Sequence, residues 1–419
     1  MGVGGVSRLV ACGVGLQFSV NYRQAQGLNH HIRDRSRVEY ALRWKQDDLR
    51  SFICCNGFSL FPIGATDQED TGNKMKALRY FGTRDIRFDS MDDAKLQDDR
   101  DAVIKVDRCA ICGSDLHIYN GHGFSEDLGF CVGHEAVGEV MEIGRAVRSL
   151  KVGDKVMLSG AVGCGSCPPC LAGVTNRCET HTSGFYGLSH ALEGCQAEAV
   201  RVPAADFNAR IIPEGVTTDQ ALLLTDSLAT AWFGCRTADI SSGKTVAVVG
   251  LGPIGLMAVE CAFVMGASTV FAIDLVPERR QIAQGLGATA LGPELAVETI
   301  RELTRGNMVD SVVEAVGINT TINLALRLAT RRGSVSVIGV NQDRKFDFPM
   351  GRAFGLGLTF RIGTCSVPEE WPQLIPLLQA GRLHPERFIS HVMPLSAGEA
   401  AYSLFNAREQ GTLKIILAP

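Results

Sequence analysis

The chain has 419 residues, of which 46% are apolar and 21% are charged, with 41 basic residues against 45 acidic ones. This length suggests two or three domains, and the apolar content together with a net charge of −4 excludes a disordered chain. Because no overall field would attract nucleic acid or an anionic membrane, neither is expected as a partner.

The first 74 residues differ from the rest of the chain in composition and in apolar pattern. They lack clear apolar periodicity, and residues 1–33 contain three arginines but no acid, a composition that resembles a transit peptide. The simpler interpretation is an extension that is disordered or not translated, because the ordered pattern begins at Met75. No secretory signal is seen, so the cytoplasm is the expected compartment.

From residue 75 to about 202 the chain shows short β-rich runs. The clearest are residues 101–106, 136–143 and 155–158, which are bounded by turns rich in glycine and aspartate. This pattern predicts a β-rich domain of short strands.

Within that region, Cys112 and His134 lie about twenty residues apart, in the sequences Cys-Gly-Ser-Asp-Leu-His and Gly-His-Glu. A thiolate and an imidazole are both good zinc ligands. A catalytic zinc needs three protein ligands and one open position. Glu135 and a more distant residue are the candidates for the third ligand.

Four of the fourteen cysteines crowd into fifteen residues, with the spacing C-x2-C-x2-C-x7-C. They are Cys164, Cys167, Cys170 and Cys178. A chain of this size does not need disulfides for stability, and this spacing lets four thiolates reach one tetrahedral zinc. The cluster predicts a closed, structural zinc site.

Between residues 226 and 365 strand candidates alternate with helix-length segments. The candidates are 246–249, 270–273, 311–314 and 335–338. This alternation predicts a parallel sheet wound from βαβ units. Residues 246–273 are very apolar, but glycines and Glu260 interrupt them, which favours a buried strand, helix and strand over a membrane span. The tail ends in a further strand candidate at 413–417.

A glycine motif of the form G-x-G-x-x-G directly follows the strand candidate at 246–249 and opens a helix of about a dozen residues. Its cofactor-binding candidates are Gly250, Gly252, Pro253, Ile254 and Gly255. Such a turn holds a dinucleotide pyrophosphate at the helix N-terminus. Asp274 ends the next strand, placed to bond a ribose hydroxyl, which favours NAD over NADP. Arg279, a further cofactor-binding candidate, and Arg280 lie just beyond and weaken that preference.

Residues 75–419 resemble the zinc-dependent medium-chain alcohol dehydrogenase family over their whole length. The stretch Gly133-His134-Glu135-x2-Gly138-x5-Gly144-x2-Val147 matches the zinc signature of the family, and the four-cysteine spacing matches its structural zinc site. Residues 196–208 and 224–230 resemble the branch that contains glutathione-independent formaldehyde dehydrogenase.

The resemblance implies an α/β fold with two domains. A GroES-like, β-rich catalytic domain would span 75–225 and be completed by 366–419. A Rossmann domain, with its doubly wound parallel sheet, would span 226–365 and bind NAD.

The resemblance also implies roles for single residues. Asp226 takes the position of the third ligand of the catalytic zinc, and Glu135 is a second-layer residue or an alternate ligand. Ser114 and His117 match the first and last stations of the family's proton relay. Thr230 matches the residue that packs against the nicotinamide.

The activity implied is hydride transfer between an alcohol, or an aldehyde hydrate, and NAD, with two zinc ions per chain. The partner is a small alcohol or aldehyde, and the protein would be a homodimer or homotetramer. A polyol or threonine dehydrogenase of the same family is one alternative. An inactive, metal-poor paralogue is another, although the intact set of ligand and relay residues argues against it.

Overall fold

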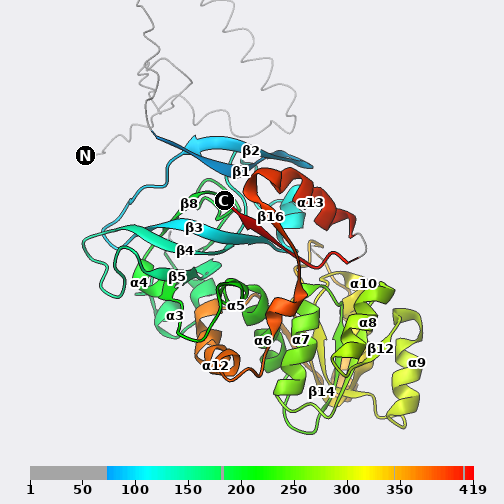
Figure 1. Ribbon diagram of the computed structural model, residues 1–419. Coiled ribbons are helices and arrows are strands. Elements are labelled where there is room, and N and C mark those ends of the chain that lie inside the picture. The colour runs from blue at the N-terminus through cyan, green and yellow to red at the C-terminus, as the bar shows by residue number, and fades with distance from the viewer. Residues whose placement is uncertain (1–72, 181–183, 344, 409–410) are drawn as a thin grey trace, which may run out of the picture. The chain divides into compact units, whose positions relative to one another are not determined.

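The computed structural model describes residues 73–180, 184–343, 345–408 and 411–419 (Figure 1). Almost all of the expected extension at residues 1–74 lies outside these residues. The first described strand, β1, begins at Lys74 and forms a hairpin with the next strand. The hairpin strands are β1 (Lys74–Gly82) and β2 (Asp85–Asp92).

The β-rich half is built on a seven-stranded sheet in the order β16-β17-β3-β4-β5-β9, with β8 also paired to β3. Its strands are β3 (Ala102–Ile111), β4 (Glu135–Ile143), β5 (Lys155–Leu158), β8 (Ala199–Val202), β9 (Ala209–Ile211), β16 (Ile389–Pro394) and β17 (Lys414–Ala418). All pairs are antiparallel except β16 with β17. The predicted β-rich domain is therefore confirmed, and strands from the C-terminal tail complete it.

Strand β3 is longer than its sequence pattern predicted. The sequence pattern predicted a strand that ends near residue 106, but β3 continues to Ile111. A register shift after Val106 accommodates the polar residues Asp107 and Arg108. The second half then pairs with β17, a partner some three hundred residues away that local alternation does not reveal.

The other half contains a six-stranded, wholly parallel sheet in the order β12-β11-β10-β13-β14-β15. Its strands are β10 (Thr245–Val249), β11 (Thr269–Ile273), β12 (Thr289–Leu291), β13 (Val309–Glu314), β14 (Ala329–Val337) and β15 (Thr359–Ile362). The predicted parallel sheet is confirmed, with β14 beginning earlier than the expected 335. Its central strands are apolar runs because helices cover both faces.

The helices divide between the two halves of the fold. Those of the parallel-sheet half are α6 (Ser227–Thr237), α7 (Pro253–Val264), α8 (Pro277–Gly285), α9 (Pro293–Leu303), α10 (Asn319–Leu328) and α11 (Met350–Leu356). The others are α2 (Asp115–Tyr119), α3 (Pro168–Leu171), α4 (Ala205–Asn208), α5 (Thr218–Leu224), α12 (Val367–Gln379) and α13 (Gly398–Ala407). Short 3-10 turns are η2 (Thr175–Arg177), η3 (Pro385–Phe388) and η4 (Leu395–Ala397). Within the described residues no helix is both long and apolar enough to cross a membrane.

One apolar cluster joins the two halves. It contains Val137 and Met157 from the β-rich half together with Val248 and Leu256 from the parallel-sheet half. The charge of Glu260 in the otherwise apolar α7 is also explained by this junction. Its Oε1 accepts the backbone N–H of His384 at 3.0 Å and lies 3.1 Å from Arg387 Nη2, so it anchors η3 to α7.

A buried ion pair fastens α12 to α6, and its loss should be measurable. Arg236 on α6 binds the fully buried carboxylate of Glu370, whereas Glu369, 3.3 Å from the same guanidinium, is 40% exposed. We expect Glu370→Gln to lower stability by about 1 kcal/mol, because a hydrogen bond between two charged groups becomes one to a neutral amide at a buried site. Thermal unfolding measures this change, and Glu369→Gln is the matched control, for which little change is expected. Equal midpoints for the two variants would contradict the role of burial.

Candidate functional site

The first predicted cluster forms from three distant segments. Cys112 directly follows β3, His134 directly precedes β4, and Asp226 directly precedes α6. Oδ2 of Asp226 lies 3.4 Å from Sγ of Cys112 and 3.5 Å from Nε2 of His134. These atoms and a carboxylate oxygen of Glu135 all lie within 4.8 Å of one another. Zinc–ligand bonds of about 2.0–2.3 Å place tetrahedral donors about 3.3–3.8 Å apart, so the spacing fits one zinc ion.

The electrostatics of this cluster also favour a cation. Burial and the negative charge of Asp226 both raise the pKa of the Cys112 thiol. Burial raises the pKa of the Asp226 carboxyl too, but hydrogen bonding and charge from His134 outweigh it and bring the pKa below its ordinary range. Two potential anions thus meet where little solvent reaches. A divalent cation between them would offset their repulsion, so the donor set fits zinc.

Asp115, which the sequence analysis did not single out, orients two of these groups. It begins α2 and is 2% exposed. Its Oδ1 lies 3.2 Å from Nδ1 of His134, and its Oδ2 accepts the backbone N–H of Cys112 at 2.9 Å. A carboxylate on one ring nitrogen directs the other nitrogen toward a metal. Its place in the motif, three residues after Cys112, was the available signal.

Two more residues missed by the sequence analysis hold Glu135. Nζ of Lys414, on β17, donates to Oε1 of Glu135 at 2.6 Å and to Oγ of Ser227 at 2.8 Å. Ser227, the first residue of α6, donates to the same Oε1 at 2.8 Å. All three side chains are buried. A lysine within an apolar strand was a usable signal, because a buried lysine needs a partner.

Of the residues predicted for the proton relay and the nicotinamide contact, Ser114 and Thr230 lie close to the cluster. Oγ of Ser114 is 3.4 Å from Nε2 of His134. The hydroxyl of Thr230 donates to Oδ1 of Asp226 at 3.0 Å, so it orients this carboxylate. His117 lies one turn further along α2, where burial and then the charge of His122 lower its pKa.

The four cysteines of the second cluster converge as predicted, with their sulfur atoms within 4.8 Å of one another. Sγ of Cys164 lies 4.0 Å from Sγ of Cys170, and Sγ of Cys167 lies 3.8 Å from Sγ of Cys178. Burial raises the pKa of Cys164, but hydrogen bonds from Ser166 and Cys167 outweigh it and lower the pKa to about 5. A thiolate stabilised in this way is ready to bind a metal.

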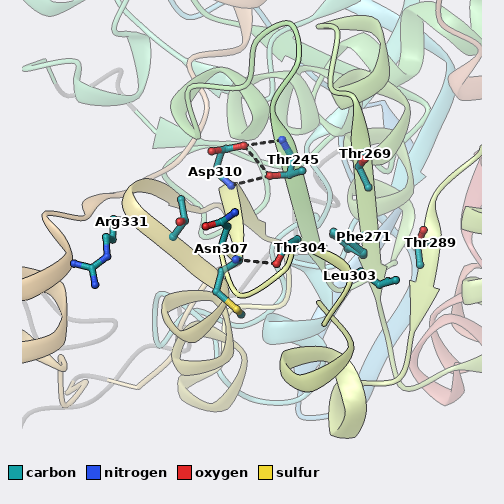
Figure 2. A pocket seen from close by; sticks show the side chains of 11 residues that line it. Thr245, Thr269, Phe271, Thr289, Leu303, Thr304, Asn307, Asp310 and Arg331 are labelled. Carbon is teal, nitrogen blue, oxygen red and sulfur yellow. Dashed lines mark hydrogen bonds between the residues drawn. The ribbon is translucent and has the colours of Figure 1, made fainter. Parts of the chain in front are cut away.

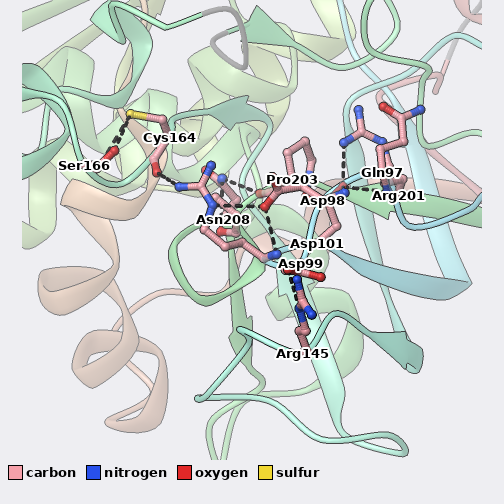
Figure 3. A network of polar contacts seen from close by, with 12 residues as sticks. Gln97, Asp98, Asp99, Asp101, Arg145, Cys164, Ser166, Arg201, Pro203 and Asn208 are labelled. Atoms are coloured by element: carbon pink, nitrogen blue, oxygen red, sulfur yellow. Dashed lines mark hydrogen bonds and ion pairs between the residues drawn. The ribbon is translucent and has the colours of Figure 1, made fainter.

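A polar network anchors this lobe to the β-rich sheet (Figure 3). The side chain of Asn208 accepts the N–H of Gly163 at 2.9 Å and donates to its carbonyl at 2.7 Å, directly before Cys164. Nearby, the buried Asp101 pairs with Arg201 at 3.0 Å. The lobe therefore does not depend on a metal alone for its position.

The same lobe holds the segment through which the chain leaves the parallel sheet. The side-chain amide of Asn176, in η2, donates to the carbonyl and hydroxyl of Thr364. Its Oδ1 accepts from Ser366 Oγ at 2.8 Å. Thr364 and Ser366 lie between β15 and α12, so the four-cysteine lobe is attached to this crossover.

The glycine turn has the geometry that its motif predicted. Gly250 has φ +90°, and a Cβ there would approach Val316 to 2.3 Å. A Cβ on Gly255 would come within 1.8 Å of the Gly250 carbonyl oxygen, which shows how closely helix and strand pack. Nothing lies within 4 Å of a Cβ built on Gly252, so the turn leaves space there. This is the arrangement that lets backbone approach a pyrophosphate.

Asp274 directly follows β11 and braces this turn. Its Oδ2 accepts the N–H of Leu251 at 2.6 Å and its Oδ1 accepts that of Val276 at 2.8 Å. Burial lowers the pKa of Arg279 below its ordinary value, although the charge of Asp274 opposes this shift. Arg280 donates instead to the backbone carbonyl of Asp274 at 2.8 Å. The carboxylate of Asp274 therefore lies against the glycine turn, and Arg280 is attached to the same segment.

A pocket of about 600 Å³ lies elsewhere on the parallel sheet (Figure 2). Thr245, Thr269 and Thr289, which begin β10, β11 and β12, line it together with Asp310, whose carboxylate accepts from the N–H and hydroxyl of Thr245. It therefore lies at the amino ends of the strands. The glycine turn follows the carboxyl end of β10, so this pocket and the turn lie at opposite edges of the sheet.

The fold and the site define a class: a zinc-type dehydrogenase with a β-rich domain and a Rossmann-like parallel sheet. Comparison with known proteins agrees. Residues 98–213 match the alcohol dehydrogenase GroES-like domain, and residues 253–380 match the zinc-binding dehydrogenase domain.

Individual relatives extend the likeness to most of the chain. A probable zinc-binding alcohol dehydrogenase of Mycobacterium tuberculosis is 42% identical over 353 residues, covering 82% of this chain and 89% of the relative. L-threonine 3-dehydrogenase of Bacillus licheniformis is 32% identical, covering 83% and 99%. The structure of alcohol dehydrogenase TADH from Thermus sp. ATN1 has a TM-score of 0.78 at 38% identity, covering 82% and 99%. The chain belongs to the zinc-dependent medium-chain alcohol dehydrogenase family and is an oxidoreductase of that type.

Proposed function

We propose that this protein is an NAD-dependent dehydrogenase that oxidises an alcohol or an aldehyde hydrate, with two zinc ions per chain. One observation carries the proposal: the thiol of Cys112, the imidazole of His134 and the carboxylate of Asp226 converge at zinc-ligand spacing. These three donors leave a fourth tetrahedral position for substrate. Cys164, Cys167, Cys170 and Cys178 would hold the second, closed zinc.

In the proposed reaction zinc supplies Lewis acidity that favours loss of the proton from the substrate hydroxyl. The hydroxyl of Ser114, beside the cluster, would take up this proton while releasing its own proton, through the ribose hydroxyl of the bound cofactor, to His117. His117 passes it to solvent, because its lowered pKa keeps the imidazole neutral and able to accept a proton near pH 7. Thr230 holds the Asp226 carboxylate in place and borders the nicotinamide. The glycine turn and Asp274 hold the rest of the cofactor.

A screen of NAD reduction tests the activity over formaldehyde, primary and secondary alcohols, polyols and threonine, with zinc measured on the same preparation. Turnover with alcohols or formaldehyde and about two zinc ions per chain would support the proposal. Preference for threonine or polyols would favour the alternative substrate class, which the threonine dehydrogenase relative brings into consideration. One zinc and no turnover would favour a metal-poor paralogue.

We also propose the domain limits. The catalytic domain would comprise 75–225 and 366–419, and the nucleotide-binding domain 226–365. The membership of β16 and β17 in the β-rich sheet supports the return of the chain to the first domain. We further propose a homodimer or homotetramer working in the cytoplasm on a small molecule, which sedimentation analysis and cell fractionation test.

Cofactor choice gives a direct prediction. We expect Asp274→Ala to weaken NAD binding by about 1–3 kcal/mol, or roughly 5- to 150-fold, because the ribose loses its acceptor and the Leu251 N–H of the turn loses its own. NADP should lose less, since an anion that repels its 2′-phosphate is removed. Fluorescence titration with NADH and NADPH measures both effects.

Asp310→Ala is the control for this prediction. Asp310 makes similar carboxylate bonds, to Thr245, but at the opposite edge of the same sheet. Its loss should leave cofactor selectivity unchanged. A wild-type protein that prefers NADPH would contradict the role given to Asp274.

A further inference from the structure

The two oxygens of Glu135 have different surroundings. Oε1 accepts hydrogen bonds from both Lys414 and Ser227. Oε2 is buried and has no hydrogen-bond partner among the described residues. Glu135 also contributes a carboxylate oxygen to the cluster of potential zinc ligands, so a metal bound there lies within reach of a carboxylate that still has an unpaired oxygen.

The charges around the cluster assign Lys414 to Glu135. A zinc ion with the Cys112 thiolate and the Asp226 carboxylate would already be neutral, and the buried Asp115 carboxylate beside His134 adds a further negative charge, so the charge of Glu135 needs another cation. Lys414 is 1% exposed and lies 2.6 Å from Glu135 Oε1. Buried charges persist in proteins when they are paired in this way.

The position of Lys414 also argues for a role at this site. It begins β17, and the rest of that strand, Ile415 to Ala418, is apolar. An apolar side chain would suit the strand as well, and a buried ion pair is weak evidence of a contribution to stability. Lys414 does, however, pair with Glu135, the residue that directly follows the proposed zinc ligand His134. This position connects the lysine to the metal site.

We propose that Lys414 is a positioning residue that, with Ser227, holds Glu135 away from the open position of the zinc. This inference rests on the proposed function, because it requires a catalytic metal at Cys112, His134 and Asp226. Among the described residues Lys414 is the only lysine or arginine paired with Glu135, so without it the metal becomes the nearest cation for this carboxylate. The carboxylate then occupies the position that substrate needs.

Imidazole binding to the cobalt-substituted enzyme tests this proposal without turnover. Imidazole enters only an open metal position, so the four-thiolate site does not respond, and the cobalt absorption spectrum reports its dissociation constant. We expect Lys414→Met to raise this constant at least about tenfold, as when only about a tenth of the sites remain open. Lys414→Arg keeps a cationic donor and should remain near the wild-type value.

A second substitution identifies the cause. In Lys414→Met/Glu135→Gln the competing carboxylate is absent, so the imidazole dissociation constant should return to within about threefold of the wild-type value. Lys155→Met is the matched control, because Lys155 forms ion pairs with Asp107 and Glu139 away from the cluster. It should leave the dissociation constant unchanged.

Should Lys414→Met fail to fold, the pair Ser227→Ala and Ser227→Ala/Glu135→Gln replaces it, with the same order expected. An unchanged constant in the single variant, or a rise that the Glu135→Gln change does not reverse, would overturn the positioning role. A wild-type enzyme whose cobalt spectrum ignores imidazole would overturn the open zinc site itself, and the positioning role with it. The two failures are therefore distinguishable.

Discussion

Asp226→Asn is expected to abolish most activity while leaving the fold intact. The substitution keeps the size of the side chain and the oxygen that accepts from Thr230. It removes the charge that would bind zinc alongside Cys112 and His134. We expect kcat/KM to fall by about 100-fold or more, because both the loss of the hydroxyl proton and the orientation of the substrate depend on the ion. Zinc content should drop from about two ions to about one.

Asp219→Asn is the matched control for this experiment. Asp219 lies on the preceding helix, α5, and its carboxylate is 3.4 Å from Arg108 in a partly exposed ion pair. The same chemical change there should leave zinc content and turnover near the wild-type values. If Asp226→Asn retained two zinc ions and normal turnover, Asp226 would not be a ligand, and Glu135 would become the better candidate.

The parts of the site that sequence predicted best are those with local spacing. The glycine turn needs a strand before it and a helix after it, and β10 and α7 stand where the motif expects them. The four-cysteine lobe is likewise encoded within fifteen residues. In both cases the residues that must meet are neighbours in the chain, so their spacing alone limits the geometry.

The remaining parts depend on contacts between distant segments. Asp226 was identified through a family resemblance, since nothing in its own neighbourhood predicts that it meets Cys112. Lys414 and Ser227 were missed, although they hold Glu135. Their approach requires β17 to pair with β3, and the same pairing extended β3 beyond its predicted end. Local alternation cannot reveal a partner supplied by the C-terminal tail.

A substitution in the four-cysteine lobe should have a large effect on stability. Cys170 is 2% exposed, and its sulfur lies 4.0 Å from that of Cys164. We expect Cys170→Ser to remove the structural zinc, because a serine hydroxyl is a poor replacement for a thiolate ligand. Three remaining cysteines would then be left without a metal. Zinc binding by such sites is itself folding free energy, so the midpoint of thermal unfolding should fall by several degrees.

This effect should spread beyond the lobe and spare the catalytic zinc. Asn176 ties the lobe to Thr364 and Ser366, so hydrogen exchange should rise in the crossover between β15 and α12. Ser166→Ala is the control: it removes one hydroxyl that helps to stabilise the Cys164 thiolate but leaves all four ligands and the backbone N–H donors, so it should keep both metals. A Cys170→Ser protein with two zinc ions and an unchanged unfolding midpoint would show that these four thiolates do not hold a metal. Retention of one zinc and of activity at low temperature, with a lowered midpoint, would separate the structural site from the catalytic one.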